Sequence, residues 1–96
     1  MYTIIFLPSF ERDLEKYVKK GGAASRLERI VELFQSGHAL PPGLHDHQLH
    51  GAMREYRELH VEGDWLLVYR KDGKKLIITC LWLVSHKKLR ERERGI

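Results

Sequence analysis

The stretch that decides the fold, residues 56–84, reads YRELHVEGDWLLVYRKDGKKLIITCLWLV. It contains three runs that are rich in β-branched, aromatic and other apolar residues, at residues 56–61, 65–70 and 76–84. Glu62-Gly63 separates the first two runs, and Lys71-Asp72-Gly73-Lys74 separates the last two with a strong Asp-Gly turn signal. The pattern therefore predicts three consecutive strands joined by short turns.

Before this stretch, the sequence predicts one further strand and two helices. Residues 2–7 are rich in β-branched and aromatic residues and predict a short, well-buried strand. Two segments with apolar residues three to four apart then predict helices, the first from Phe10 and the second ending near residues 35–37. Ser9 is the expected cap of the first helix, and Ser25 with Glu28 is spaced as a capping box for the second.

The order of these elements predicts an α+β fold in a single domain, residues 1–96. An N-terminal strand, a helical hairpin and a three-stranded antiparallel meander would form one sheet with the helices on one face. The chain length of 96 residues suits one domain with a modest core. We expect the other face of the sheet to be free to act, and the charged tail, residues 87–94, to be a short solvated helix or a frayed end.

Composition limits the partners and the compartment. Seventeen Lys and Arg residues against thirteen Asp and Glu give a formal charge of +4, which favours a polyanionic partner, although basic domains without a nucleic-acid role are common. The single cysteine, Cys80, excludes a disulfide framework and is expected to be buried. No apolar stretch approaches membrane-spanning length, and residues 1–7 lack the features of a signal peptide, so we expect a cytoplasmic protein.

Histidines supply the main chemical signal. Three of the six fall in the segment HDHQLHG, residues 45–51, inside a stretch at 38–53 whose prolines and glycines predict an exposed loop. Loops of this length in compact domains are often functional. Imidazole is the side chain best suited to moving protons near neutral pH. Histidines that converge with a carboxylate on a basic surface therefore indicate phosphodiester chemistry without a metal.

Strand pairing predicts where these groups meet. A two-residue turn at Asp72-Gly73 would place Trp65 opposite Cys80 and Asp64 opposite Leu81. Both strands would then run on to one end of the sheet, where the loop could close a cluster of His47, His50, His60, Asp64 and His86. Arg54, Arg57 and Arg70 lie on or beside these strands, where guanidinium groups could grip phosphate oxygens.

Less specific explanations also fit. Each histidine taken alone could be a surface or hydrogen-bonded structural residue, and the arginines could simply solvate an exposed strand. A zinc site could form from His45, His47 and His50 with His60 or Asp64, but the spacing matches no established zinc pattern. Cys80 lies among apolar neighbours that give its thiol no reason to ionise. The sequence therefore predicts no metal and no other cofactor.

Three motifs resemble those of the YafQ-like branch of the RelE/ParE toxin superfamily. Residues 46–51 are similar to its Asp-His-x-Leu-x-Gly motif, residues 56–65 to its Tyr-Arg-x-x-His-Val-x-x-Asp-Trp stretch, and Ser85-His86 to its Thr/Ser-His pair. The order of elements agrees over nearly the whole chain. The resemblance implies a RelE-like fold and a toxin of a type II toxin-antitoxin system that acts as a ribosome-dependent mRNA endoribonuclease.

The resemblance also implies the catalytic set. His47, His60, Asp64 and His86 fall at the positions of the branch's catalytic histidines and aspartate. The implied reaction is attack of an RNA 2′-hydroxyl on the adjacent phosphate, which leaves a cyclic phosphate and needs no metal. We assign His86 to protonation of the leaving oxygen, Asp64 or a neighbouring histidine to the 2′-proton, and His47 and His60 to the phosphate.

Two positions depart from the branch pattern. Trp82 stands where the branch normally has an arginine, which removes an expected phosphate clamp and predicts reduced activity unless Arg54 or Arg57 substitutes. Arg90 stands where the branch normally has a C-terminal phenylalanine, and an arginine there could stack on or grip RNA. The expected RNA-binding residues are therefore Arg54, Arg57, Arg70 and Arg90.

The expected partners are a cognate antitoxin, mRNA and ribosomal RNA. An antitoxin segment would cover the free sheet face or the helical hairpin. The main alternative is a catalytically impaired or silent RelE-fold protein that binds RNA or an antitoxin without cleavage. A stand-alone RNA-binding module or a zinc protein is a further alternative.

Overall fold

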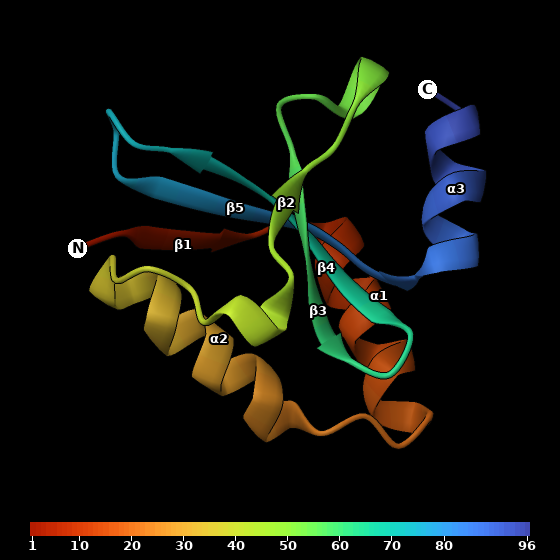
Figure 1. The fold of residues 1–96 in the computed structure, drawn as a ribbon. Helices are drawn as coiled ribbons and strands as arrows, with labels where there is room; N and C mark the ends of the chain where they lie inside the picture. Colours follow the sequence, from red (N-terminus) through yellow and green to blue (C-terminus); the bar gives the residue numbers. More distant parts are fainter.

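The three predicted C-terminal strands form the centre of a five-stranded sheet in the computed structural model, which describes residues 1–96 (Figure 1). The sheet order is β1-β5-β4-β3-β2, in which β1 is Thr3–Phe6, β2 is His47–Gln48, β3 is Arg57–Glu62, β4 is Trp65–Asp72 and β5 is Ile77–Ser85. The helices are α1, Pro8–Lys19, α2, Ala24–Ser36, and α3, His86–Arg94, with short 3₁₀ turns η1, Pro42–Leu44, and η2, Gly51–Met53. The predicted α+β class is confirmed.

The first strand runs parallel to its neighbour and is less buried than predicted. β3, β4 and β5 pair antiparallel as expected, but β1 pairs with β5 in parallel, so the sheet is mixed. A tight turn would force β1 and β5 to pair antiparallel. A long connection joins them instead, and it allows them to pair in parallel. β1 is an edge strand, and Ile5 and Phe6 are 41% and 40% exposed, so the predicted burial was wrong.

The register of β4 against β5 also differs from the prediction. Trp65 lies opposite Ser85 rather than Cys80, because Asp72 pairs with Ile77 and residues 73–76 make a longer turn. Asp72 stabilises this turn by accepting hydrogen bonds from the backbone N–H groups of residues 74 and 75. An irregularity between Val68 and Tyr69 shifts the pairing by one more residue of β5. The observed register brings the start of β4 to the last residue of β5.

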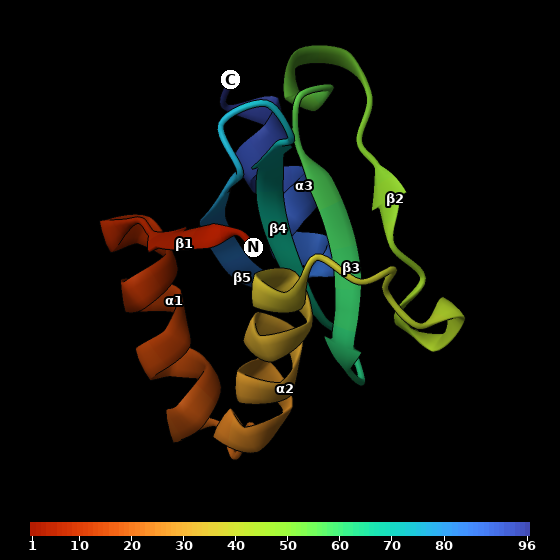
Figure 2. The same ribbon diagram turned by 90° about the vertical axis from the view of Figure 1, so that its left-hand side faces the viewer.

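Helices α1 and α2 lie on one side of the sheet and α3 on the other (Figure 2), and each face of the sheet has its own apolar core. On one face, α1 and α2 contribute Phe10, Tyr17 and Phe34 to a cluster that includes sheet residues such as Leu67. On the other face, α3 buries Leu89 in a second cluster. The other members of that cluster are Leu49, Met53, Leu66, Val68 and Val84. The face predicted to be free is therefore partly covered by the C-terminal helix.

Neither predicted helix cap is present. α1 begins at Pro8, whose fixed φ suits the first helical turn, and the Ser9 hydroxyl instead donates to the Leu81 carbonyl oxygen at 2.7 Å. α2 begins at Ala24 without a side-chain cap, so Ser25 lies inside the helix. Its end agrees with the prediction, because Gly37 closes it in the left-handed conformation at φ 74°. None of the three α-helices is both long and apolar enough to span a membrane.

The segment predicted to be a loop contains a short edge strand. β2 pairs antiparallel with β3, with His47 opposite Glu58 and Gln48 opposite Arg57. Two residues are too few to produce a recognisable strand pattern, which is why the prediction missed it. Leu49 extends the attachment, since its N–H donates to the Tyr56 carbonyl oxygen at 3.0 Å and its side chain is buried.

A buried ion pair joins α3 to α1 and the sheet. Asp13 on α1 is 3% exposed and accepts two hydrogen bonds from the Arg92 guanidinium, both at 2.8 Å. The same carboxylate accepts the backbone N–H of Leu83 at 3.1 Å. The Arg92 guanidinium also lies 5.2 Å from the centre of the Trp82 ring. Apart from Leu89, α3 is strongly charged, so this ion pair is a principal contact that fixes its position.

Replacement of Asp13 tests this contact. We expect Asp13→Ala to lower the free energy of unfolding by about 3 kcal/mol, because it leaves the half-buried Arg92 guanidinium without its carboxylate. The matched control is Glu32→Ala, which breaks an exposed pair with Arg29 and should cost less than about 1 kcal/mol. Urea denaturation of both variants measures the difference, and equal losses would contradict the structural weight given to Asp13.

Candidate active site

The centre of the site is a pair formed by His86 and Asp64. Asp64 lies in the turn between β3 and β4, and His86 is the first residue of α3, directly after the Ser85 that pairs with Trp65. The Asp64 carboxylate accepts a hydrogen bond from Nδ1 of His86, and the backbone N–H of His86 lies 3.4 Å from the same oxygen. Because Nδ1 faces a carboxylate, Nδ1 carries a proton and Nε2 is left available for chemistry.

The charges around Asp64 keep it ionised. The hydrogen bond from the His86 side chain, followed by that from the His86 backbone, holds the pKa of Asp64 below its usual value. The charges of His86 and of Arg90, one helical turn further along α3, act in the same direction. Asp64 is therefore a stable acceptor that fixes the orientation of the His86 ring.

His60 continues the site along the same face. Its ring centre lies 5.4 Å from that of His86 and 5.2 Å from that of His45, with both pairs edge to face. His45 takes the left-handed conformation, with φ 50°. None of the hydrogen bonds in the structure involves the His60 ring, so its nitrogens are free to exchange protons. The row His45, His60, His86 and Asp64 thus joins the loop, β3 and α3.

His47 lies on the same face but is already engaged. Its Nε2 is 2.7 Å from a carboxylate oxygen of Glu58, and its Nδ1 is 2.9 Å from the backbone carbonyl oxygen of His45. Both acceptors are satisfied when both ring nitrogens carry protons. Glu58 is 7% exposed, which makes it a rigid support for the ring. The cluster can therefore supply a proton acceptor, an oriented proton donor and a third ring that Glu58 holds in place.

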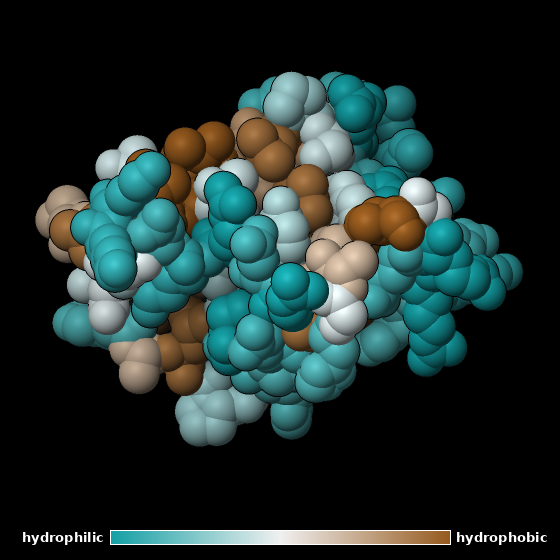
Figure 3. Space-filling view, turned by 90° about the horizontal axis from the view of Figure 1, so that it is seen from above, coloured by the Kyte–Doolittle hydropathy of each residue, from teal (hydrophilic) through white to brown (hydrophobic).

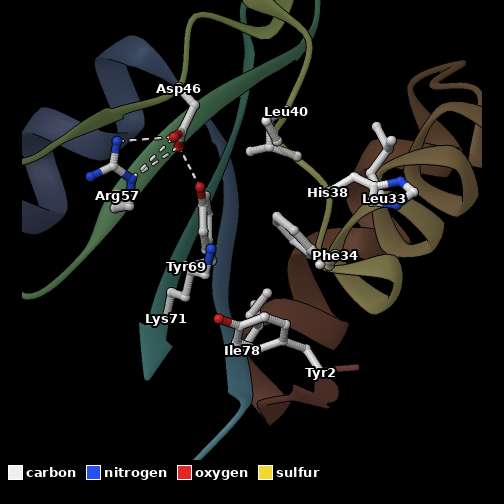
Figure 4. Close-up of a pocket in the computed structure, with 12 residues that line it drawn as sticks. Tyr2, Leu33, Phe34, His38, Leu40, Asp46, Arg57, Tyr69, Lys71 and Ile78 are labelled. Carbon is white, nitrogen blue, oxygen red and sulfur yellow. Dashed lines mark hydrogen bonds and ion pairs between the residues drawn. The ribbon is translucent and has the colours of Figure 1, made fainter. Parts of the chain in front are cut away.

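Of the expected arginines, Arg57 points away from the histidines. It pairs across the strands with Tyr69, whose side chain belongs to the core on the α1 and α2 face. Figure 4 shows its guanidinium bound to Asp46 beside a cavity of about 500 Å³ between α2 and the sheet. This hydrogen bond to Asp46 raises the pKa of Arg57. The geometry separates Arg57 from the histidine cluster.

Arg54 and Arg70 lie together near the other end of β4. They line an open hollow of about 800 Å³ with no apolar residue in its lining, next to Lys71, Lys74 and Lys75. Arg70 is 3.8 Å from Glu55 and lies over the ring of Tyr56. Seen from above Figure 1, hydrophilic side chains cover most of the surface (Figure 3). These arginines form a basic surface distinct from the histidines, whereas Arg90 lies near Asp64.

The remaining candidates lie outside the histidine cluster, and only the burial of Cys80 agrees with the sequence expectation. His50 is exposed at the start of η2, and its side chain makes no hydrogen bond, ion pair or ring contact with the cluster. No group of three or more His, Cys, Asp or Glu side chains is arranged to hold a metal ion, so the donor geometry gives the zinc alternative no support. Cys80 is buried, and burial raises the pKa of its thiol to about 12.

Sequence reasoning missed two members of the site. Glu58 lies two residues before His60 on β3, and His45 lies two residues before His47. Because alternate residues of an extended strand share one face, this spacing of two was a usable signal for both. His45 is predicted from the sequence only as a ligand in the zinc alternative, and Glu58 is not among the predicted residues.

The fold and the histidine site define a small RelE-like toxin, and comparisons with known proteins identify the branch. A family model described as "Bacterial toxin of type II toxin-antitoxin system, YafQ" matches residues 2–91. The chain belongs to this family, as its motifs predicted. The mRNA interferase toxin YafQ of Escherichia coli K12 is 31% identical over 68 residues, which cover 70% of this chain and 74% of that relative.

Solved structures agree with this assignment. A metal-bound toxin from Helicobacter pylori is 32% identical with a TM-score of 0.84, and the match covers 93% of this chain and 99% of that one. YafQ in the E. coli DinJ-YafQ toxin-antitoxin complex is 25% identical with a TM-score of 0.81, covering 92% and 96%. The RelE-like fold is therefore confirmed over nearly the whole chain.

The His86–Asp64 contact predicts a specific change in titration. Because it lowers the pKa of Asp64 in the folded protein, its stabilising effect is present above the ordinary carboxyl pKa and is lost as the pH falls through the lowered value. In His86→Ala, we expect the Asp64 midpoint to rise towards its ordinary value, as measured by carboxyl carbon NMR. Asp72 is the internal control, because backbone N–H groups lower its pKa and should continue to do so. An unmoved Asp64 midpoint would contradict the pairing.

Proposed function

We propose that the protein is an mRNA interferase that cleaves mRNA at the ribosome by metal-independent acid–base catalysis. The observation that carries this proposal is the His86 ring, which Asp64 orients beside the unengaged ring of His60. One imidazole with a free Nε2 and a second with free nitrogens are the two groups that transesterification of RNA requires. The similarity to the E. coli mRNA interferase toxin supports the same reaction class.

In the proposed reaction, a ring nitrogen of His60 accepts the proton of the 2′-hydroxyl. The 2′-oxygen then bonds to phosphorus, and the bond from phosphorus to the 5′-oxygen breaks. His86 enters the step with both ring nitrogens protonated, and its Nε2 donates a proton to that leaving oxygen, so the products are a 2′,3′-cyclic phosphate and a 5′-hydroxyl. Asp64 acts as a positioning residue in this scheme, because its carboxylate is occupied by His86 and its pKa is lowered, which makes it a poor base.

Positive charge around the reacting phosphate comes from His47 and Arg90. His47 with both nitrogens protonated would be cationic and lies on the same face as His60. Arg90 projects from α3 near Asp64 and His86. Arg54 and Arg70, with the lysines around their hollow, would hold the RNA backbone further away, as P–O⁻ groups favour guanidinium and ammonium donors. Arg57 would contribute indirectly, since Asp46 occupies it.

The proposed setting is the cytoplasm, where ribosomes and mRNA are found, with a cognate antitoxin that inhibits the free toxin. The positive charge of the chain suits both ribosomal RNA and an acidic antitoxin segment. The DinJ-YafQ complex of E. coli supports an antitoxin partner for this family member. A small open reading frame next to the gene is the first observation to seek.

Trp82 favours a second candidate, a toxin-fold protein with weak or no cleavage. The Trp82 ring occupies the place where the branch normally has an arginine. It packs against the core beside α3 and lies under the Arg92 guanidinium. Trp82 therefore serves to hold α3 rather than to bind phosphate. An active site that lacks one oxyanion donor typically loses about 100-fold in rate.

Histidine replacement separates the two candidates. We expect His86→Ala to lower mRNA cleavage on translating ribosomes by at least about 100-fold, because it removes the proton donor. His38→Ala is the matched control, because His38 lines the cavity on the opposite face and should keep wild-type activity. Cleavage is read by primer extension, with growth arrest after induction as a second measurement. Growth arrest that persists unchanged in His86→Ala would favour binding without cleavage.

Chelation tests the metal-independent chemistry. The purified protein is treated with EDTA, dialysed, and then assayed with ribosomes in the Mg²⁺ that they need. We expect its cleavage rate to equal that of untreated protein. The reason is that the donor and the acceptor are both side chains of this protein. Loss of activity after dialysis, with recovery on added Zn²⁺, would instead support a metal site among the histidines.

A further inference from the structure

Asp46 lies between two histidines of the site but contacts the opposite side of the sheet. Along β2 and its flanks, His47 and Leu49 lie on the α3 face, where His47 meets Glu58 and Leu49 joins the second core. Asp46 directly precedes His47, so strand alternation directs its side chain to the α1 and α2 face. Figure 4 shows its carboxylate directed at Arg57 and Tyr69.

The contacts of Asp46 are made with rigid partners. One carboxylate oxygen accepts hydrogen bonds from Nε of Arg57 at 3.1 Å and from Nη2 at 2.9 Å, and the other accepts the Tyr69 hydroxyl proton. Arg57 and Tyr69 are paired neighbours on β3 and β4. Tyr69 is 2% exposed, and its ring centre lies 4.7 Å from that of Phe34. Asp46 is thus bound to two central strands on the sheet face opposite the histidine site.

The segment that Asp46 holds has few other attachments. β2 consists of two residues, and both are exposed. On the C-terminal side of His47, the further attachments are the buried Leu49 side chain, the Leu49 N–H, which donates to the Tyr56 carbonyl oxygen, and the Gln48 amide, which donates to the Arg54 carbonyl oxygen at 2.6 Å. On the N-terminal side, where His45 adopts a left-handed conformation, Leu44 packs against the core on the α1 and α2 face, and Asp46 makes the side-chain hydrogen bonds.

We propose that Asp46, Arg57 and Tyr69 form a clamp on the α1 and α2 face of the sheet. This clamp positions His45 and His47, on the opposite face, for RNA cleavage. All three are positioning residues, because none faces the reacting groups. The contact of the Asp46 carboxylate with two nitrogens of Arg57 fixes how residues 45–47 are rotated about the strand axis. That rotation determines whether the His47 ring contacts Glu58 and whether the His45 ring contacts His60. This inference rests on the proposed function for its effect on rate, but the effect on the histidines can be measured without RNA.

The protonation of the clamp is consistent with its role. Burial, and then the hydrogen bond to Asp46, raises the pKa of Tyr69 well above its usual value, so the hydroxyl remains a donor at all physiological pH values. Arg57 remains charged. Both hydrogen-bond donors of the clamp therefore keep their protons near neutral pH.

Three substitutions, each removing less of the contact than the one before, test the clamp. Asp46→Asn removes the charge, Arg57→Lys keeps the charge without the fork, and Tyr69→Phe removes only the hydroxyl. We expect Asp46→Asn to lower kcat for ribosomal mRNA cleavage by about 100-fold with little change in KM, because small misplacements of reacting groups carry a cost of this order. The other two variants should lie between Asp46→Asn and the wild type. The control Glu32→Gln removes an exposed carboxylate from an arginine pair on α2 and should match the wild type.

NMR of the free protein gives the readout that a general loss of stability would not produce. In Asp46→Asn, the ring-nitrogen shifts of His47 and His45 should move towards those of exposed histidine, while His86 and Asp64 keep their wild-type shifts. Unchanged His45 and His47 shifts together with wild-type cleavage would overturn the clamp. If Asp46→Asn does not fold, the same criteria apply to Tyr69→Phe. Absence of cleavage by the wild type would reject the proposed function alone, since the histidine shifts would still decide the clamp.

Discussion

The pairing of β4 with β5 is the constraint on which the rest of the molecule depends. Trp65 lies opposite Ser85, so the turn that carries Asp64 and the first residue of α3 arrive at the same point. A register displaced by one residue would exchange the faces of β5 and separate Asp64 from His86. The long turn after Asp72 and the irregularity beside Val68 set this register. Two features remote from the histidines thus determine whether the site forms.

The two faces of the sheet divide the work of the protein. The α1 and α2 face holds the larger core and the Asp46 contacts, whereas the α3 face holds the histidines over a smaller core. Strand alternation makes this division possible, because neighbouring residues of one short segment reach both faces. The same segment can therefore be anchored on one side and remain exposed for chemistry on the other. A domain of 96 residues gains a fixed site in this way without a separate supporting layer.

The sequence allowed the fold class and much of the site to be predicted, for physical reasons that also explain the errors. Long apolar runs predicted β3, β4 and β5, and the motif around His60 and Asp64 predicted the family, which the comparisons confirmed. The register was wrong because a turn with Leu76 at φ 56° cannot be recognised from an Asp-Gly signal. Arg57 was expected at the histidines, although it lies three residues before His60 on β3, and strand alternation places side chains at that offset on opposite faces. The position of Asp46 opposite it could be known only from the structure.

The thin attachment of α3 has a consequence for how the protein responds to heat. This helix presents His86, yet its buried contacts are limited to Leu89 and the Arg92 ion pair with Asp13. Segments with few buried contacts open at lower free energy than the core from which they detach. Fraying of α3 would withdraw the proton donor while the sheet and the helical hairpin remain folded. Catalytic competence and global folding are therefore separate equilibria in this protein, and warming should end the first before the second.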